Sequence, residues 1–360
     1  MREMSAKALK LGLPLSVQVD LTYRCNERCV HCYLDHDDHG EMTAAEIADL
    51  LDQLAEAGAL FLVLSGGEIF LRQDVFEIVA HARRLRFLVK LKTNGVMIDR
   101  ARAERIADLG VEAVQVSVYS HNARVHDAIT TLPGSFRRTI EGVRLLKACG
   151  VKVGLTNVLM KQNASDYPGV QALARTLGVA CTIDATIAPM MDGNRDVLAL
   201  NVDGGTLRKV LNDPAVAGPA GEACLPPGAI GETGALDALP CSAGHVSCYV
   251  SPYGEVYPCV QFPLTAGSVR GTPFMDIWRN SPRLADMRSV GMSDVAGCAS
   301  CIHAESCSRC PGLAFLEGDM RGPSIQDCKK AFARTGVAPL PIVRTQRKQN
   351  PADETGSRTC

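Results

Sequence analysis

Short β-branched and apolar runs alternate with amphipathic helical stretches between Pro14 and about Pro189. This alternation is typical of consecutive βα units on a parallel sheet. The predicted strands are Ser16–Leu21, Phe61–Leu64, Leu88–Lys92, Ala113–Val118, Lys152–Val158 and Cys181–Ile187. Helices are predicted after Thr43, which has Glu46 at the capping-box position, and near Asp74, Asp99, Ser135 and Asp166. Six such units predict an α/β fold, a partial (β/α)6 barrel of the TIM type.

Four unusual segments follow the ends of these predicted strands. They are Cys25 to Cys32, Gly66-Gly67-Glu68, Thr93-Asn94-Gly95 and Ser117. Active sites of such barrels lie at the carboxyl ends of the strands. We therefore expect the four segments to meet on one face.

The pattern loosens after the barrel into a Gly- and Pro-rich connector, and dense cysteine follows. The expected division is an N-terminal extension 1–14, a barrel 15–196, a linker 197–239, a small cysteine-rich α+β domain 240–335 and a flexible tail 336–360. Within the small domain we predict a hairpin, Ser247–Ser251 with Glu255–Tyr257, and one helix at Phe274–Arg279. This segment has little apolar surface, so we expect metal ligation to contribute to its folding free energy.

Composition narrows the function. The 360 residues contain 38 Lys and Arg against 39 Asp and Glu, a net charge of -1, which argues against nucleic acid as a partner. The longest apolar run is Ala59–Leu64, far short of the roughly 18 residues of a membrane span. Residues 1–14 lack the apolar core and cleavage site of a signal peptide. A cytoplasmic protein is expected.

Fifteen cysteines in a reducing cytosol indicate metal or redox chemistry rather than disulfides. Three lie between residues 25 and 32, and eight lie between residues 241 and 328. The isolated Cys149, Cys181, Cys224 and Cys360 are expected to be small hydrophobic residues.

The first cluster spaces Cys25, Cys29 and Cys32 as C-x3-C-x2-C in a loop after the first strand. Three thiolates can ligate three irons of a cubane and leave the fourth iron open to a chelating small molecule. The alternative is a zinc site completed by His31 or by a distant ligand.

This spacing resembles the signature of radical S-adenosylmethionine enzymes, and Gly66-Gly67-Glu68 resembles that family's GGE motif. The resemblance implies a 4Fe-4S cluster on the three cysteines and S-adenosylmethionine as cofactor. It further implies that Gly66, Gly67 and Glu68 receive the methionine ammonium group, and that Asn94 and Ser117 contact the ribose or the carboxylate. For Asn94 and Ser117 the alternative is ordinary turn and strand-end chemistry.

Three positions depart from the family pattern. His31 stands where the family usually has an aromatic residue, Val118-Tyr119-Ser120 replaces the usual Leu-Asp-Gly, and Thr130 replaces a frequent Arg. Arg124 and Lys92 are the candidates to replace that carboxylate-binding Arg.

The run Asp35-His36-Asp37-Asp38-His39 consists of metal-ligand residue types. A second metal site and a solvated loop are both compatible with it. We favour the loop, because no regular element fixes the ligand geometry.

The second cluster contains eight cysteines, enough for two fully ligated cubanes or a pair of zinc sites. They are Cys241, Cys248, Cys259, Cys298, Cys301, Cys307, Cys310 and Cys328. Their order resembles the SPASM domain of peptide-modifying radical S-adenosylmethionine enzymes, although the last C-x3-C is C-x2-C here. The resemblance implies two interleaved 4Fe-4S clusters, one on Cys241, Cys248, Cys259 and Cys310 and the other on Cys298, Cys301, Cys307 and Cys328. If four cysteines ligate each cluster, no iron is left open to bind a substrate, which implies a role in electron transfer.

The resemblance implies an oxidoreductase that cleaves S-adenosylmethionine to a 5'-deoxyadenosyl radical and abstracts hydrogen from its substrate. The expected substrate is a ribosomally synthesised precursor peptide, which would be crosslinked or otherwise modified. Sulfatase-maturing relatives are disfavoured, because Val260 stands where they carry an Asp base. An electron donor such as flavodoxin or ferredoxin is an expected partner. Only some two dozen residues precede Cys25, too few for a fused leader-recognition domain, so either a separate leader-recognition protein or direct binding of the leader is expected. The alternatives are a haem-pathway side-chain decarboxylase, an iron-sulfur electron carrier and a zinc-stabilised binding module.

Overall fold

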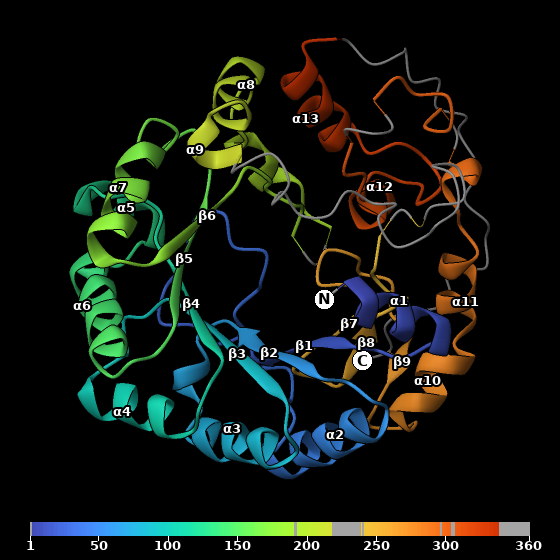
Figure 1. The fold of residues 1–360 in the computed structure, drawn as a ribbon, viewed down its shortest axis with the longest axis horizontal. Coiled ribbons are helices and arrows are strands. Elements are labelled where there is room, and N and C mark those ends of the chain that lie inside the picture. The colour runs from blue at the N-terminus through green and yellow to red at the C-terminus, as the bar shows by residue number, and fades with distance from the viewer. Residues whose placement is uncertain are drawn as a thin grey trace.

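The computed structural model describes residues 2–190, 193–217, 239, 241–295, 297–303 and 307–337. A single sheet runs through the centre of the molecule, and helices surround it (Figure 1). The strand order is β6-β5-β4-β3-β2-β1-β7-β8-β9. The first six strands are parallel: β1 (Ser16–Thr22), β2 (Phe61–Gly66), β3 (Leu88–Thr93), β4 (Ala113–Ser117), β5 (Val153–Val158) and β6 (Ala180–Asp184). All six predicted strands are confirmed, with ends that shift by up to three residues.

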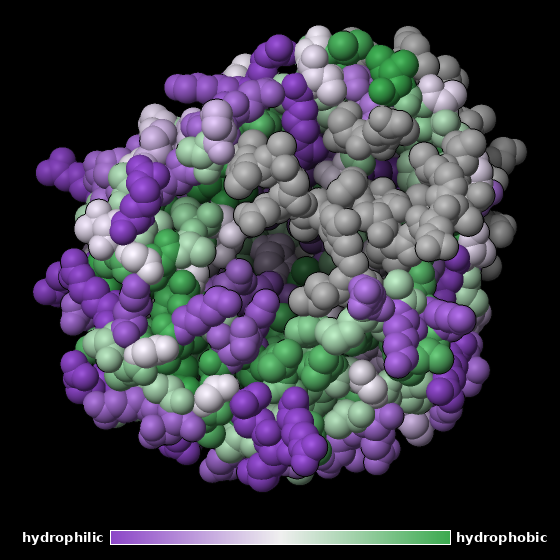
Figure 2. All heavy atoms as spheres, viewed as in Figure 1, coloured by the Kyte–Doolittle hydropathy of each residue, from purple (hydrophilic) through white to green (hydrophobic). Residues whose placement is uncertain are grey.

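The helices between these strands cover the outer face of the sheet (Figure 1). They are α2 (Ala44–Glu56), α3 (Val75–Arg84), α4 (Arg100–Asp108), α5 (Ala123–Thr130), α6 (Ser135–Ala148) and α7 (Tyr167–Leu177). Thr43 and Glu46 form the predicted capping box. Hydrophilic side chains gather along the outer rim of these helices, as Figure 2 shows. The chain begins with a further helix, α1 (Arg2–Leu11), which the hydrophobic pattern did not predict.

The C-terminal segment continues the barrel sheet. Strand β7 (Ser247–Val250) pairs in parallel with β1, and β8 (Glu255–Tyr257) and β9 (Gly267–Ser268) add antiparallel neighbours. The hairpin was predicted, but its pairing with β1 was not. Because β1 is paired on both sides, one sheet joins the cysteine-rich segment to the barrel.

The hydrophobic core is also shared between the two parts. Helix α10 (Phe274–Asn280) buries Phe274 and Trp278 in the same apolar cluster as the barrel strands, and α11 (Pro282–Arg288) adds Leu284. The C-terminal segment thus buries large apolar side chains in the core of the barrel, although its sequence indicated little apolar surface. Helices α12 (Pro311–Leu316) and α13 (Ile325–Thr335) complete this part.

The predicted linker is partly helical. It contains the 3-10 helix η2 (Asp196–Leu200) and the helices α8 (Gly204–Leu211) and α9 (Pro214–Ala217). Two further 3-10 helices, η1 (Ile69–Leu71) and η3 (Met292–Asp294), lie outside the linker. Helix α8 packs on α13, and the Asn212 amide donates to the Ala333 carbonyl at 3.0 Å. Residues 218–238 of the linker and the tail beyond 337 lie outside the described residues. None of the helices in the described ranges is both long and apolar enough to cross a bilayer.

Candidate active site and auxiliary cysteine groups

A cavity of about 480 Å³ lies at the carboxyl ends of the barrel strands. Seven of the eight residues predicted for the first cluster and the cofactor line it: Cys25, Cys29, Cys32, Gly66, Gly67, Asn94 and Ser117. Val260 and Gln261 of the C-terminal segment form part of its wall. The four segments predicted to meet on one face therefore do meet there, with Glu68 as the exception.

Backbone hydrogen bonds to the end of α5 hold the loop that carries the three cysteines. The Arg28 N–H donates to the Thr130 carbonyl at 3.1 Å, and the Val30 N–H donates to the Ile129 carbonyl at 3.0 Å. Within the loop the Cys32 N–H donates to the Cys29 carbonyl at 3.0 Å. Backbone hydrogen bonds thus define the direction in which the thiols face.

The three thiols fit an iron-sulfur cluster. Burial raises the pKa of the Cys25 thiol to about 12, and it raises the pKa of Cys29 and Cys32 as well. Buried thiols of this kind lose their protons only when a cation binds, because the positive charge of the metal stabilises the thiolates. Beside them at the cavity wall, Glu27 Oε1 and His31 Nδ1 are buried without a hydrogen-bond partner. Polar atoms of this kind are available to a bound molecule.

Close backbone packing requires the two glycines. A Cβ on Gly66, which has φ of +129°, would lie 2.2 Å from the Thr22 carbonyl oxygen. A Cβ on Gly67 would lie 2.2 Å from the Arg24 carbonyl oxygen. The Gly67 N–H donates to the Thr22 carbonyl at 2.7 Å. The glycines thus bring the end of β2 against the start of the cysteine loop.

Glu68 is turned away from the cavity. Its side chain is fully buried, and its carboxylate accepts from the Thr93 hydroxyl at 2.7 Å, the Asn94 N–H at 2.9 Å and the Phe70 N–H at 3.1 Å. This position differs from the predicted contact with a cofactor ammonium group. Glu68 instead fixes the end of β3, and the Asn94 side chain extends from there to Asn26 Oδ1 at 2.7 Å and to Cys25 Sγ at 3.8 Å.

Lys92 is the only Lys or Arg among the described residues that line the cavity. Its ammonium group donates to Gln18 Oε1 at 3.0 Å, and it forms no ion pair within the described part of the chain. Arg124 does not line the cavity. Of the two candidates to replace the carboxylate-binding Arg, the geometry favours Lys92.

A buried polar chain leads from Lys92 to the sheet that joins the two parts. Gln18 Nε2 donates to Asp20 Oδ1 at 3.0 Å, and the Tyr249 hydroxyl of β7 donates to Asp20 Oδ2 at 3.1 Å. The Tyr23 hydroxyl lies 2.7 Å from that of Tyr249. Sequence analysis missed this network, because Tyr249 is more than 200 residues away from Asp20 and Tyr23 in the chain.

Burial raises the pKa of Asp20 to about 6, against the effects of the Gln18 hydrogen bond, the Lys92 charge and the Tyr249 hydrogen bond. The folded chain holds this proton more tightly than the unfolded chain, so Asp20 lowers stability as pH rises from about 4 to about 6. The difference in the free energy of unfolding between Asp20→Asn and wild type should therefore increase by about 1 kcal/mol, in favour of the variant, from pH 5 to pH 7.5. Urea unfolding of both metal-free chains at the two pH values measures this gain, and a constant difference would contradict the assignment.

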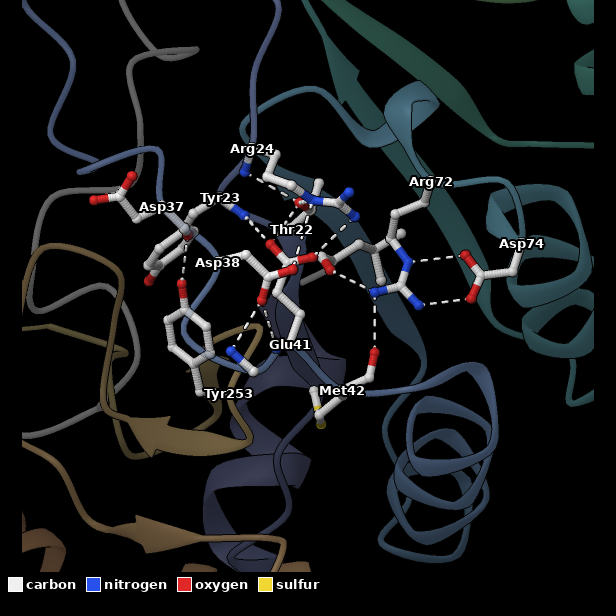
Figure 3. A network of polar contacts seen from close by, with 12 residues as sticks. Thr22, Tyr23, Arg24, Asp37, Asp38, Glu41, Met42, Arg72, Asp74 and Tyr253 are labelled. Atoms are coloured by element: carbon white, nitrogen blue, oxygen red, sulfur yellow. Dashed lines mark hydrogen bonds and ion pairs between the residues drawn. The ribbon is translucent and has the colours of Figure 1, made fainter.

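The acidic and imidazole run forms a structural loop. His39 pairs with Asp35 at 2.9 Å, and the Tyr253 hydroxyl, at the tip of the β7-β8 hairpin, donates to the Asp37 carbonyl at 2.9 Å. Figure 3 shows Arg24 beside Asp38 and Glu41 in the same network, with ion-pair distances of 4.0 Å and 3.2 Å. The loop thus joins the end of β1 to the hairpin.

The eight later cysteines affect one another's pKa values in two sets. Burial is the main cause of their raised pKa values, and neighbouring thiols contribute to the same rise. Cys259 raises the pKa of Cys248, Cys241 raises that of Cys259, and both Cys241 and Cys259 raise that of Cys310. In the same way Cys307 is affected by Cys298, Cys301 and Cys328. We name the sets Cys241, Cys248, Cys259, Cys310 and Cys298, Cys301, Cys307, Cys328 the first and second auxiliary groups. This division follows the ligand sets that the resemblance implied, which stay a prediction.

Within the described ranges, no three Cys, His, Asp or Glu side chains are grouped as the ligands of one metal ion would be. Three sulfurs on one zinc ion would lie roughly 3.8 Å apart, whereas a cubane spreads its thiolates over several irons. Cys149 and Cys181 pack against the main core, as expected, and Cys224 and Cys360 fall outside the described residues.

Comparison with known proteins gives two family matches. The model of the radical SAM superfamily matches residues 19–173, and that of an iron-sulfur cluster-binding domain, SPASM, matches residues 241–311.

Similar curated proteins have different substrates. Mycofactocin maturase MftC of Mycobacterium tuberculosis is 30% identical over 91% of this chain and 86% of its own length. AdoMet-dependent heme synthase of Methanosarcina barkeri is 28% identical over 84% of this chain and 92% of its own. Among solved structures, Streptococcus suis SuiB bound to precursor peptide SuiA matches with a TM-score of 0.71 and 17% identity, covering 91% of this chain and 79% of that one. This last match shows the fold alone.

Proposed function

The chain belongs to the radical SAM superfamily and carries a SPASM domain, and from this premise we propose that it modifies a ribosomally synthesised precursor peptide by radical chemistry. The observation that carries the proposal is the convergence of Cys25, Cys29 and Cys32 on a cavity whose wall includes the C-terminal segment. When bound there, a 4Fe-4S cluster and S-adenosylmethionine supply a 5'-deoxyadenosyl radical that removes hydrogen from an unactivated C–H bond.

The residues of the chain provide binding and positioning. Gly67 and Asn94 line the cavity and are assigned to the amino acid end of the cofactor. Ser117 on β4 lies across the cavity and is assigned to the ribose or the carboxylate. The barrel and the C-terminal segment together exclude water from the reacting atoms.

Two observations support a peptide as substrate. MftC, named a mycofactocin maturase, is similar along 91% of the chain, and SuiB, which has the same fold, has been solved with its precursor peptide. The eight cysteines in two groups of four further fit two fully ligated auxiliary clusters, which would accept electrons from the substrate. The position after Cys259 is Val260, an apolar side chain at the cavity wall, so an Asp base is not available there.

A second candidate is a tetrapyrrole side-chain enzyme. AdoMet-dependent heme synthase of Methanosarcina barkeri and pre-heme d1 synthase of Dinoroseobacter shibae are 28% and 29% identical to this chain. The Lys92 ammonium group at the cavity wall would suit a propionate carboxylate as well as a peptide carboxylate.

The reconstituted chain, supplied anaerobically with S-adenosylmethionine, dithionite and a precursor peptide encoded beside its gene, is expected to change the peptide's mass. About twelve irons per chain are expected, as three cubanes require. Mass spectrometry measures the peptide, and a parallel reaction contains an iron porphyrin with propionate side chains. An unchanged peptide beside a porphyrin that loses side-chain mass would replace the proposal with the second candidate.

A further inference from the structure

Arg309 lies between the two auxiliary groups. It occupies the C-x2-C segment whose ends belong to different groups, Cys307 to the second and Cys310 to the first. Its side chain is only 3% exposed. A cation this deeply buried needs compensating negative charge.

Carbonyl oxygens hold the guanidinium in place but do not neutralise it. Arg309 Nε and Nη2 donate to the Gly322 carbonyl at 3.1 Å and 2.7 Å, and Nη2 donates to the Met320 carbonyl as well. Nη1 is buried and has no hydrogen-bond partner among the described residues. The side chain is thus fixed on one edge and keeps a free N–H donor on the other.

The charges that act on Arg309 come from both groups. They are, in order of size, Cys298 of the second group, Cys310 of the first group, Asp327 and Cys307 of the second group. The Asp327 carboxylate already accepts from the Cys310 N–H at 2.7 Å and from the Lys330 ammonium at 3.1 Å. No ion pair between Asp327 and Arg309 is formed in the described residues. Because burial raises the pKa values of these thiols, they would add counter-charge only as thiolates bound to metal.

An iron-sulfur cluster in each group would supply that counter-charge. Four thiolates outweigh the positive charge of a cubane core and leave about two negative charges. Each one-electron reduction adds another. A fixed cation and an N–H donor beside the sulfurs stabilise the reduced form more than the oxidised form, which raises the reduction potential.

We propose that Arg309 is a positioning residue shared by the two auxiliary clusters, and that its fixed charge raises the reduction potentials of both. The inference rests on the proposed function, because it requires a cluster in each group. It assigns to the segment between Cys307 and Cys310 a role beyond ligation: electrostatic coupling of the two clusters.

The test is a potentiometric titration of the reconstituted holoenzyme with dithionite, followed by electron paramagnetic resonance. Arg309→Gln removes the charge but keeps an amide that can donate to the Gly322 carbonyl. At a fixed solution potential we expect the reduced-to-oxidised ratio of both auxiliary clusters to fall at least tenfold, which corresponds to about 59 mV for one electron. The cluster on Cys25, Cys29 and Cys32 is the internal reference and should not shift.

Arg321→Gln is the matched control, because it removes a positive charge from the same part of the chain. Arg321 is partly exposed and pairs with Asp286 at 2.6 Å, so its loss should leave all potentials unchanged. Full iron content with unchanged auxiliary potentials in Arg309→Gln, or a fall in only one cluster, would overturn the proposal.

Arg309→Lys decides the question where Arg309→Gln loses auxiliary iron. It keeps the charge but loses the planar fork, so we expect both auxiliary potentials to stay close to those of wild type, and a tenfold fall of the reduced-to-oxidised ratio despite the retained charge would overturn the proposal. About four irons per wild-type chain would contradict the assignment of the auxiliary clusters itself. By contrast, about twelve irons per chain with an unmodified peptide would contradict only the proposed substrate and leave the cluster assignment intact.

Discussion

Cys29→Ala is expected to reduce cleavage of S-adenosylmethionine by more than about 100-fold, to the background of the protein-free reaction. Cys29 is the central ligand of the triad, and its sulfur lies 3.4 Å from Glu27 Oε2 and 3.9 Å from the Tyr119 hydroxyl. Two remaining thiols cannot hold three irons of a cubane. Chromatographic detection of 5'-deoxyadenosine measures the loss, and iron content should fall by about four atoms per chain.

Cys181→Ala is the matched control. Cys181 lies on β6, packs partly buried against the main core and does not line the cavity. Its replacement should leave 5'-deoxyadenosine formation within about twofold of wild type, because a small packing change far from the triad has little effect. Equal activity in Cys29→Ala and Cys181→Ala would contradict the assignment of the triad as the reactive centre.

Local signals in the sequence predicted the barrel. The six strands and the capping box of Thr43 and Glu46 depend on residues close together in the chain, so periodicity and cap chemistry were enough. The pairing of β1 with β7 joins Val17 to Cys248, more than 200 residues away, and no local pattern reveals it. For the same reason the core of the cysteine-rich part was underestimated.

Spacing and strand order predicted which residues meet at the site, but not what every side chain does. The triad, Gly66, Gly67, Asn94 and Ser117 reach the cavity as expected. Glu68 does not, because its acceptors for hydrogen bonds face Thr93 and Asn94 at the end of the next strand. Arg309 was missed because a sequence motif shows the ligands of a cluster and not the charges between two clusters.

Gly67→Ala is expected to destabilise the chain by about 3 kcal/mol, at the upper end of the usual cost of overpacking. The new Cβ would lie 2.2 Å from the Arg24 carbonyl oxygen and 2.7 Å from the Tyr23 carbonyl oxygen. Both are backbone atoms, so no side-chain rotation relieves the clash. The residue that must move is next to Cys25, and the first cluster should therefore lose iron as well. Anaerobic thermal unfolding and iron analysis measure the two effects.

Gly204→Ala separates this clash from the general effect of replacing glycine. No atom lies within 4 Å of a Cβ at Gly204, which is the first residue of α8. Alanine there should leave stability unchanged or raise it by up to about 1 kcal/mol, since it favours helix and restricts the unfolded chain. If Gly67→Ala unfolded like Gly204→Ala and kept its full iron content, the close approach of β2 to the cysteine loop would not be what positions Cys25. The GGE turn would then act through the cofactor alone, because neither stability nor cluster loading would depend on the missing side chain.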